Sequence, residues 1–331
     1  MPADRFVFAE GQLSVDSDDA GLTGRFRQLY PEDRSGNEVA WAGPAVGCRV
    51  RCAEGLAAIS FDDPEPLDAF AFCTALFPDR GFVEGPASSD GWRSIARAGS
   101  PHRPLIALRG DLALADLDQP WQPFVANIAV NRLLRLQRSM LFFHAGAVSV
   151  AGKGVLITGV KASGKTTTCL TLASRGHGFL GDEIGALRMR DSTLLPIRRA
   201  VAIRHGVRAR EVERQLAVVP HEVEIFPDGE ERTRVVVAQL FPQAGAMPAP
   251  LSLALLLRGK RSVPNAERFE FGFEHAGQLT PLPCCFWGRS AARLMMDLAR
   301  LMRRVHCYHL DVGPPEETAA LIEQLVRGLA E

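Results

Sequence analysis

The sequence has no excess of charge of either sign and no long apolar run. Arginine and lysine together number 38, as do aspartate and glutamate, so the formal net charge is zero. This balance argues against a general nucleic-acid binder or a protein held at a membrane surface by charge. The apolar run LSLALLL, residues 251–257, is far too short to span a bilayer. The sequence therefore predicts a protein that binds neither nucleic acid nor membrane.

The N-terminus lacks a basic region followed by an apolar run, and the cysteines lack a regular spacing. The first residues read MPADRFVFAEGQ, so we expect no secretory signal. Seven cysteines, an odd number, favour reduced thiols in the cytoplasm. Cys48 and Cys52 have no partner pair with zinc-site spacing, and the HCYH at residues 306–309 fits a strand better than a metal site.

Lysine is scarce, and its positions draw attention to one stretch. The only lysines are Lys153, Lys161, Lys165 and Lys260. The first three of them fall in or beside GVKASGKT, residues 159–166, which has the form G-x-x-x-x-G-K-T. That form is typical of a phosphate-binding loop when a strand precedes it and a helix follows.

The chain length suits one large or two medium domains, and no internal repeat is visible. Residues 1–122 carry short apolar runs separated by Gly, Pro, Asp and Ser, which predicts an α+β accessory domain with few helices. One helix is expected over residues 67–77. Residues 123–331 are predicted to form a second domain, of the α/β class with the phosphate loop near its start.

The second domain shows clear periodic segments around the loop. Helical spacing covers residues 124–139, and the turn AGKG, residues 151–154, predicts a hairpin between strands at 140–150 and 155–159. A helix is expected over residues 165–176, closed by Gly176. The other expected segments are strands at 178–183, 185–190, 233–241, 250–259 and 306–312, and helices at 291–305 and 315–330.

The loop pattern assigns specific chemistry to its residues. Glycines let backbone N–H groups turn inward onto phosphate oxygens, and the helix N-terminus adds partial positive charge. Lys165 is expected to reach the β- and γ-phosphates, and the Thr166 hydroxyl to ligate Mg²⁺. The alternative is a glycine-rich turn that merely begins a helix. The predicted nucleotide-binding residues are Gly159, Val160, Lys161, Ala162, Ser163, Gly164, Lys165, Thr166 and Thr167.

Two flanking features narrow the function of the loop. Asp182 and Glu183 follow Lys165 by one helix and one short strand, so we expect them at the carboxyl end of a strand, facing the phosphates. One carboxylate there can hold a metal ion and the other can accept a proton from an attacking hydroxyl; the alternative is a turn aspartate. His144 begins the hairpin that leads into the loop. It is either structural or able to orient a carboxylate, relay a proton or ligate a metal.

These residues, taken in order, resemble the HPr serine kinase/phosphorylase family. The similar elements are His144, the strand at 154–159, the loop, Arg175-Gly176-His177 and Asp182-Glu183. The same order is similar to the nucleotide-binding core of ATP-dependent phosphoenolpyruvate carboxykinases. The resemblance covers about forty residues closely and implies an HPr-kinase/carboxykinase type of P-loop domain that uses ATP and Mg²⁺.

The resemblance also implies roles for single residues. It makes Asp182 the candidate catalytic base, with Lys165 and His144 as further catalytic residues, and Thr166, Asp182 and Glu183 the candidate metal ligands. The chain differs from HPr kinases at residues 160–163 of the loop, at Glu183 where they have aspartate, and in lacking a clear EIRGLGI segment. It is more similar to HPr-kinase-related proteins of bacterial biosynthetic clusters.

The predicted function is therefore ATP-dependent transfer of the γ-phosphoryl group to a hydroxyl acceptor. The expected acceptor is a serine of a small protein or peptide. Two alternatives stay open: a small-molecule kinase, and a regulatory protein that binds ATP without passing phosphate to an acceptor. The expected partners are ATP and the acceptor, with self-association into a homo-oligomer left open.

Overall fold

The computed structural model describes most of the chain and divides it into two units. The described residues are 3–31, 33–35, 42–53, 56–63, 81–84, 93–97, 104–109, 112–116, 122–204, 210–225, 230–279, 281–286 and 289–329. Unit 1 is Met1–Gln137 and unit 2 is Arg138–Glu331. The division lies beyond the boundary predicted at residue 122. The reason is that helix α3 (Gln122–Leu136) contacts elements of unit 1.

Unit 1 is built on one mixed sheet. In the described residues its order is β3-β1-β2-β4-β5-β9-β8-β7-β6, in which β2 and β4 are parallel and all other neighbours are antiparallel. Its strands are β1 (Asp4–Phe8), β2 (Gly11–Ser17), β3 (Arg34–Ser35), β4 (Ala45–Ala53), β5 (Leu56–Phe61), β6 (Phe82–Glu84), β7 (Arg93–Arg97), β8 (Pro104–Arg109) and β9 (Leu112–Asp116).

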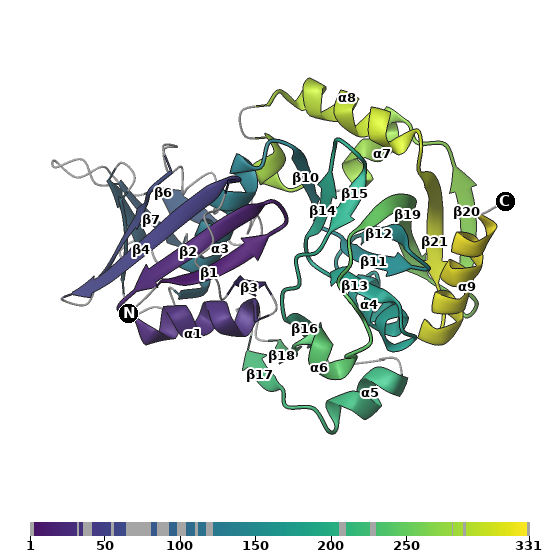
Figure 1. Ribbon diagram of the computed structural model, residues 1–331, viewed down its shortest axis with the longest axis horizontal. Helices are drawn as coiled ribbons and strands as arrows, with labels where there is room; N and C mark the ends of the chain where they lie inside the picture. Colours follow the sequence, from purple (N-terminus) through teal and green to yellow (C-terminus); the bar gives the residue numbers. More distant parts are fainter. Residues whose placement is uncertain are drawn as a thin grey trace. The chain divides into compact units, whose positions relative to one another are not determined.

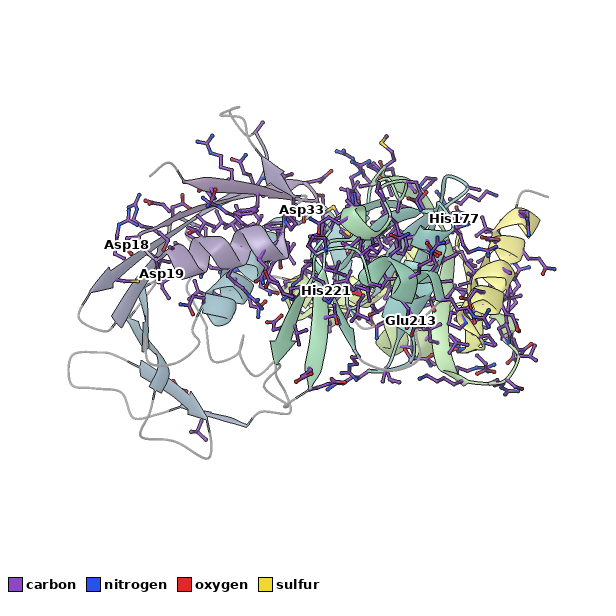
Figure 2. All side chains as sticks on the ribbon, turned by 90° about the horizontal axis from the view of Figure 1, so that it is seen from below. Asp18, Asp19, Asp33, His177, Glu213 and His221 are labelled. Carbon is purple, nitrogen blue, oxygen red and sulfur yellow. The ribbon has the colours of Figure 1, made fainter. Side chains whose placement is uncertain are left out.

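Alternation of buried and half-buried residues along β1 and β2 gives this sheet an apolar face. Helix α1 (Ala20–Leu29) follows β2 and packs on that strand and on α3. Asp19 caps its first turn by accepting a hydrogen bond from the Leu22 N–H, and Figure 2 shows this residue where the helix begins. The described part of unit 1 contains both strands and helices, whereas the helix expected at 67–77 lies outside the described residues.

Unit 2 contains a larger mixed sheet and a small one (Figure 1). The larger sheet runs β10-β14-β15-β19-β12-β11-β13, and β21 also pairs with β19 and carries β20 at its other edge. The small sheet has the order β16-β18-β17. The strands are β10 (Met140–Phe143), β11 (Gly146–Val150), β12 (Lys153–Gly159), β13 (Gly178–Gly181), β14 (Gly185–Arg188), β15 (Thr193–Leu195), β16 (Val201–Arg204), β17 (Glu222–Ile225), β18 (Glu231–Val235), β19 (Ala249–Lys260), β20 (Asn265–Phe269) and β21 (His306–Val312).

The hairpin before the loop is present, with one correction. β11 and β12 pair in antiparallel register around a two-residue turn, in which Ala151 and Gly152 both have positive φ. The strand predicted over 140–150 is not continuous. It is interrupted at His144, so that β10 pairs with β14 while β11 pairs with β12 and β13. The segment 233–241, predicted as one strand, likewise ends at Val235 and continues as the short helix α6 (Val237–Leu240).

Helices cover the larger sheet of unit 2. α4 (Lys165–Ser174) and α9 (Pro315–Gly328) contact each other, and α4 also packs on β11 and β13 over an apolar core. The predicted end of α4 at Gly176 is confirmed, since the N–H groups of Gly176 and His177 donate back to the last turn of the helix. Further helices are α5 (Arg210–Leu216), α7 (Phe273–Ala276) and α8 (Ala291–Met302), with short 3₁₀ turns at Gly277–Leu279 and Pro283–Phe286.

In the described part of the chain, no helix is both long enough and apolar enough to cross a membrane. The cysteines in that part are unbridged.

Candidate functional site

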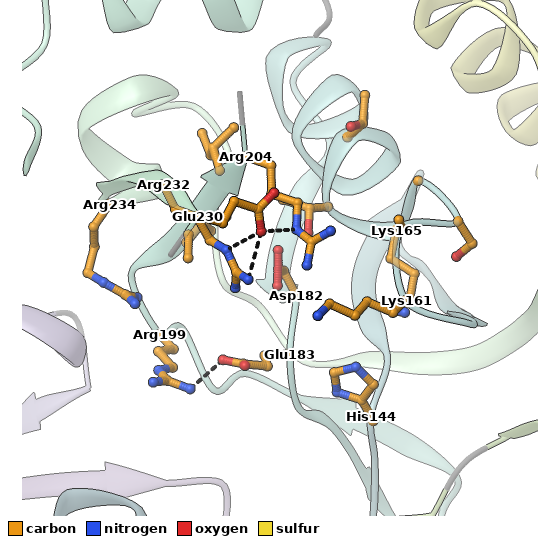
Figure 3. A pocket seen from close by; sticks show the side chains of 18 of the residues that line it. His144, Lys161, Lys165, Asp182, Glu183, Arg199, Arg204, Glu230, Arg232 and Arg234 are labelled. Atoms are coloured by element: carbon orange, nitrogen blue, oxygen red, sulfur yellow. Dashed lines mark hydrogen bonds and ion pairs between the residues drawn. The ribbon is translucent and has the colours of Figure 1, made fainter. Parts of the chain in front are cut away.

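One cavity in unit 2 gathers nearly all of the predicted site residues. It has a volume of about 580 Å³, and Figure 3 shows the side chains that line it. Gly159 and Val160 do not line it; the side chain of Val160 is exposed elsewhere. The predicted residues that do line the cavity are His144, Lys161, Ala162, Ser163, Gly164, Lys165, Thr166, Thr167, Asp182 and Glu183.

The direction of the strands explains why these residues meet. β13 is antiparallel to β11, and β11 is antiparallel to β12, so β12 and β13 point the same way. β19 is parallel to β12. The loop after β12, the acidic pair after β13 and the last residue of β19 therefore lie at the same edge of the sheet. This is the edge at which α/β sheets collect their ligands, as expected from the sequence.

The loop between β12 and α4 requires a glycine at its start. A Cβ on Gly159 would lie 2.7 Å from Ser163 Oγ and 2.8 Å from Leu257 Cβ, closer than van der Waals contact permits. The loop consequently passes tightly over β19 and turns back into α4, whose first residue is Lys165. The Ser163 hydroxyl is buried and has no hydrogen-bond partner among the described residues. A phosphate oxygen would satisfy this hydroxyl.

The Lys165 side chain folds over the loop. Its Nζ donates to the carbonyl oxygens of Gly159, at 2.6 Å, and of Val160, at 3.2 Å. Burial lowers the pKa of Lys165 below its ordinary value, and the charge of Asp182 opposes this change. An ammonium group inside the loop, at the N-terminus of a helix, provides a strong site for an anion.

Asp182 is a carboxylate with a raised pKa. Burial raises the pKa of Asp182 to about 6, and the negative charge of Glu183 adds to this effect. A side-chain hydrogen bond from Thr166 acts in the opposite direction. At neutral pH the group is therefore mainly ionised but close enough to its pKa to accept a proton readily.

Glu183 and His144 line the same cavity as Asp182. Glu183 forms an ion pair with Arg199, and about half of its side chain is exposed (49%). Burial acts to raise the pKa of Glu183, but the charge of Arg199 and neighbouring cations outweigh it and hold the pKa below its usual range. Burial lowers the pKa of His144, and the positive charge of Lys165 lowers it further. The negative charge of Glu183 acts in the opposite direction and raises this pKa. His144 thus lies near Glu183 and Lys165.

The structure adds residues that the sequence pattern did not identify. They come from the small sheet, from the segment before it and from the end of β19, and their side chains complete the cavity. Lys260, at the end of β19, is the third lysine near the loop. The sequence had suggested Lys153, but Lys153 begins β12 and therefore lies at the end of that strand away from the loop. For the arginines, the sequence offered one indication: Arg232 and Arg234 are two residues apart, as expected for side chains on one face of a strand. The added polar residues are Arg199, Arg204, Glu230, Arg232, Arg234 and Lys260.

The Arg175-Gly176-His177 segment lies outside the cavity lining and has a structural contact. Arg175 donates to both carboxylate oxygens of Glu323 on α9, at 2.6 and 2.7 Å, and His177 Nε2 lies 2.9 Å from Oε1 of the same residue. This cluster ties the end of α4 to α9.

The donor set near the loop fits a magnesium ion. Thr166 and Asp182 supply hard oxygen donors that already contact each other, and Glu183 is the next residue. Mg²⁺ prefers such ligands. Burial and, second to it, the charge of Glu183 raise the pKa of Asp182, and a divalent cation would stabilise both carboxylates.

Comparisons with known proteins find sequence similarity over part of the chain. No family model matches it. HPr kinase/phosphorylase of Chlorobium limicola is 38% identical over 69 residues, which are 20% of this chain and 21% of that protein. The enzyme of the same name from Clostridium botulinum (strain Eklund 17B / Type B) is 42% identical over 52 residues, 16% of this chain and 17% of that protein.

The chain spans about a fifth of the length of the curated relatives it matches. Among solved structures, the HPr(Ser) kinase/phosphatase from Coxiella burnetii aligns with this chain at 16% identity and a TM-score of 0.29. The alignment covers 56% of this chain and 94% of the Coxiella chain. The predicted resemblance to HPr kinase/phosphorylases is thus confirmed over a limited segment.

Proposed function

We propose that this protein is an ATP-dependent phosphotransferase that moves the γ-phosphoryl group of ATP to a hydroxyl acceptor. One observation carries the proposal: a single cavity contains a phosphate-binding loop and, beside it, a carboxylate whose pKa is raised to about 6. A loop alone would suit any nucleotide-binding protein. A proton acceptor next to the loop is what a transfer to a hydroxyl additionally requires.

In this proposal each residue has a separate task. Lys165 and the loop N–H groups bind the β- and γ-phosphate oxygens, and the hydroxyl of Ser163 adds a donor. Thr166 and Glu183 hold Mg²⁺, which offsets charge on the phosphates when bound. Asp182 accepts the proton of the acceptor hydroxyl as the new oxygen–phosphorus bond forms and the bond to the departing ADP oxygen breaks.

His144 supports the carboxylates in this scheme. Its imidazole lies close enough to Glu183 and Lys165 for their charges to change its pKa. It can orient Glu183 or pass on a proton, and both tasks concern the transfer step rather than the binding of ATP.

The acceptor we propose is a serine of a small protein or peptide, in keeping with the names of the partly matching relatives. The same site would also serve a small hydroxyl-bearing metabolite, because the hydroxyl and its proton acceptor are common to both. A protein that binds ATP without an acceptor is the remaining alternative.

A transfer assay with two variants tests the proposal. The full chain is incubated with γ-labelled ATP and candidate peptides or metabolites. Asp182→Asn should bind ATP but lose transfer by about 10²–10⁴-fold, because an amide cannot accept the proton at neutral pH. Lys165→Ala should lose at least about 10²-fold, because it removes one preorganised positive charge from the phosphates.

The matched control is Asp191→Asn, a surface aspartate of the same unit that pairs with Arg188 and should leave transfer unchanged. ATP binding without acceptor-dependent transfer of label would favour the regulatory alternative. Normal transfer by Asp182→Asn would assign the proton acceptor elsewhere.

A further inference from the structure

Two arginines face each other on the small sheet of unit 2. Arg204 of β16 and Arg232 of β18 are direct partners in the antiparallel register, so their side chains leave the same face of the sheet. Both side chains line the cavity. Like charges directly opposite each other destabilise a sheet unless an anion lies between them.

A carboxylate of the chain itself lies between these arginines. Glu230 Oε2 is 3.2 Å from Arg204 Nε and 2.9 Å from Arg232 Nη2, and Figure 3 shows both contacts. The Glu230 side chain is about a third exposed (36%), so it bridges the arginines from the open side of the cavity. The two guanidinium groups are thus spaced to share one carboxylate oxygen.

The neighbouring Arg234 differs from this pair. It is almost fully buried, donates to Glu224 at 2.6 Å and to the Ala200 carbonyl at 2.8 Å, and therefore holds the sheet together. Among the described residues that line the cavity, Arg204 and Arg232 share one carboxylate; the Arg204 side chain is about a third exposed (33%) and that of Arg232 is largely buried (14%).

The charge of the whole cavity exceeds what a nucleotide site on the loop uses. Seven cationic side chains line it against three carboxylates, among the described residues. Lys161 and Lys165 belong to the loop, whereas the pair from the small sheet belongs to another wall. Figure 3 shows the Glu230 carboxylate held by these two arginines, and the pair lines the same cavity as Asp182 and the loop lysines. A second anion would therefore bind at the wall formed by the small sheet while the loop holds the phosphates.

We propose that the phosphate acceptor carries a carboxylate near its hydroxyl, and that this carboxylate binds between Arg204 and Arg232 in place of Glu230. This inference rests on the proposed function, because it names a property of the acceptor. The carboxylate is either that of an acidic residue next to a serine in a peptide or that of a free hydroxy amino acid. In both cases Glu230 occupies the position until the acceptor arrives.

The competing explanation gives Glu230 a structural task only, as the neutralising partner of two strand arginines. The two explanations predict opposite results for the same variant. If Glu230 competes with the acceptor, removing its charge strengthens binding of a carboxylate ligand. If Glu230 is only structural, its removal weakens the sheet and improves no binding.

The test uses the full chain saturated with ADP and Mg²⁺, so that the loop is filled. The probes are two fluorescent hexapeptides, one with aspartates flanking a central serine and one with asparagines in their place. The native chain should bind the aspartate peptide more tightly. Arg232→Gln and Arg204→Gln should each weaken that binding by about ten-fold to a hundred-fold, since each removes one charge-assisted pair.

Glu230→Gln should strengthen binding of the aspartate peptide several-fold and leave the asparagine peptide unchanged. Arg214→Gln is the matched control, because Arg214 is an exposed arginine on α5 outside the cavity. Its binding should equal that of the native chain. The affinity of each variant for ADP shows whether unit 2 is folded. If Arg232→Gln does not bind ADP, the conclusion is drawn from Arg204→Gln instead.

A second pair of probes identifies the source of the carboxylate. L-serine and L-serine amide differ in that group alone. If the native chain prefers L-serine over its amide and Arg232→Gln loses this preference, the carboxylate between the arginines is that of a free amino acid. If the native chain instead prefers the aspartate peptide over the asparagine peptide, the carboxylate is that of a peptide side chain. Equal binding of charged and uncharged probes by the native chain overturns the proposal, as does weaker carboxylate binding in Glu230→Gln.

The outcome can be separated from that of the proposed function. If no acceptor receives label from ATP but the arginine variants still abolish carboxylate preference, the anion position stands and the transfer proposal fails. If transfer occurs and the arginine variants keep the native preference between probes, only the present inference fails.

Discussion

The raised pKa of Asp182 has an energetic consequence for the folded chain. The pKa is about 6 in the native state against about 3.8 ordinarily, so ionising this carboxyl opposes folding. The unfavourable contribution is fully present above pH 6, shrinks as the pH falls between these two values, and vanishes below pH 3.8. A site group that weakens the fold in this way is common where activity requires it.

We therefore predict that Asp182→Asn stabilises the metal-free chain at pH 7.5, by an amount on the order of 1–2 kcal/mol. Urea unfolding at pH 7.5 and pH 4 measures the effect, which should be much smaller at the lower pH. Glu213→Gln, at an exposed position on α5, serves as the control. A native chain that is as stable as the variant at pH 7.5 would mean that the pKa of Asp182 is not raised.

His144 supplies the second prediction at the scale of single residues. Because its neighbours are Glu183 and Lys165, His144→Ala should slow phosphoryl transfer more than it weakens ATP binding. An imidazole that relays a proton contributes about 10²–10⁴-fold, and one that only orients a carboxylate contributes less. Comparison of kcat with the dissociation constant of ATP separates the two. A variant with the native rate would make His144 a structural residue.

At this scale the sequence predicted the groups that follow one another along the chain. The loop, Asp182 and Glu183 form a short continuous pattern, and the direction of two strands was enough to bring them together. The arginines of the cavity could not be found in this way. Arg204 and Arg232 reach it through the pairing of β16 with β18, which lie about 30 residues apart in the chain, and Arg199 lies just before β16. No local sequence pattern encodes that pairing.

At the scale of elements, the cluster of Arg175, His177 and Glu323 fixes α4 against α9. The bidentate hydrogen bonds from Arg175, followed by the contact with His177, lower the pKa of Glu323 to about 2. Since this value lies below the ordinary 4.5, the stabilisation is fully present above pH 4.5. It is lost as the pH falls toward 2.

Glu323→Gln should accordingly lower the free energy of unfolding by about 1 kcal/mol at pH 7, a modest value because Arg175 is partly exposed. The difference from the native chain should shrink as the pH approaches 3. Chemical denaturation at several pH values measures it, with the exposed Glu213→Gln on α5 as the control. A loss that stays constant down to pH 3 would contradict the assigned pKa.

Elements with strong periodicity were predicted well, whereas interruptions were not. The hairpin, α4, α8, β21 and α9 follow their sequence patterns closely. The break at His144 was missed because apolar residues continue on both sides of it, and a period of two cannot reveal where a strand changes its partner. The chain there leaves β10 at one edge of the sheet and enters β11, which lies between β12 and β13, and this change is set by tertiary pairing.

At the scale of the whole molecule, the described residues that line the cavity all belong to unit 2. We predict that residues 138–331 alone bind ATP·Mg²⁺ with the affinity of the full chain. At a ligand concentration of 100 times the dissociation constant, binding should stabilise the fragment by about 2.7 kcal/mol. Thermal unfolding with and without ATP·Mg²⁺ measures this, and Lys165→Ala in the same fragment should remove the shift.

A folded fragment without an ATP-dependent shift would show that unit 1 is needed for the site. The division between the two units falls after α3, whereas the sequence placed a boundary before it. The periodicity of α3 shows a helix with a broad apolar face, but it does not show which of two cores receives that face; contacts with α1, β2 and β4 decide it.

The strand β19 pairs with β12, β15 and β21, and its late position in the chain affects the order in which unit 2 folds during synthesis. The loop strand β12 finds its parallel partner only in β19, whose residues follow far downstream. Closing such a long segment is entropically unfavourable and slows folding. On the ribosome the phosphate loop must therefore emerge long before its supporting strand is synthesised. Nucleotide cannot assist the earliest stage of folding, and the exposed edge of β12 depends on its hairpin partner β11 for protection until β19 arrives.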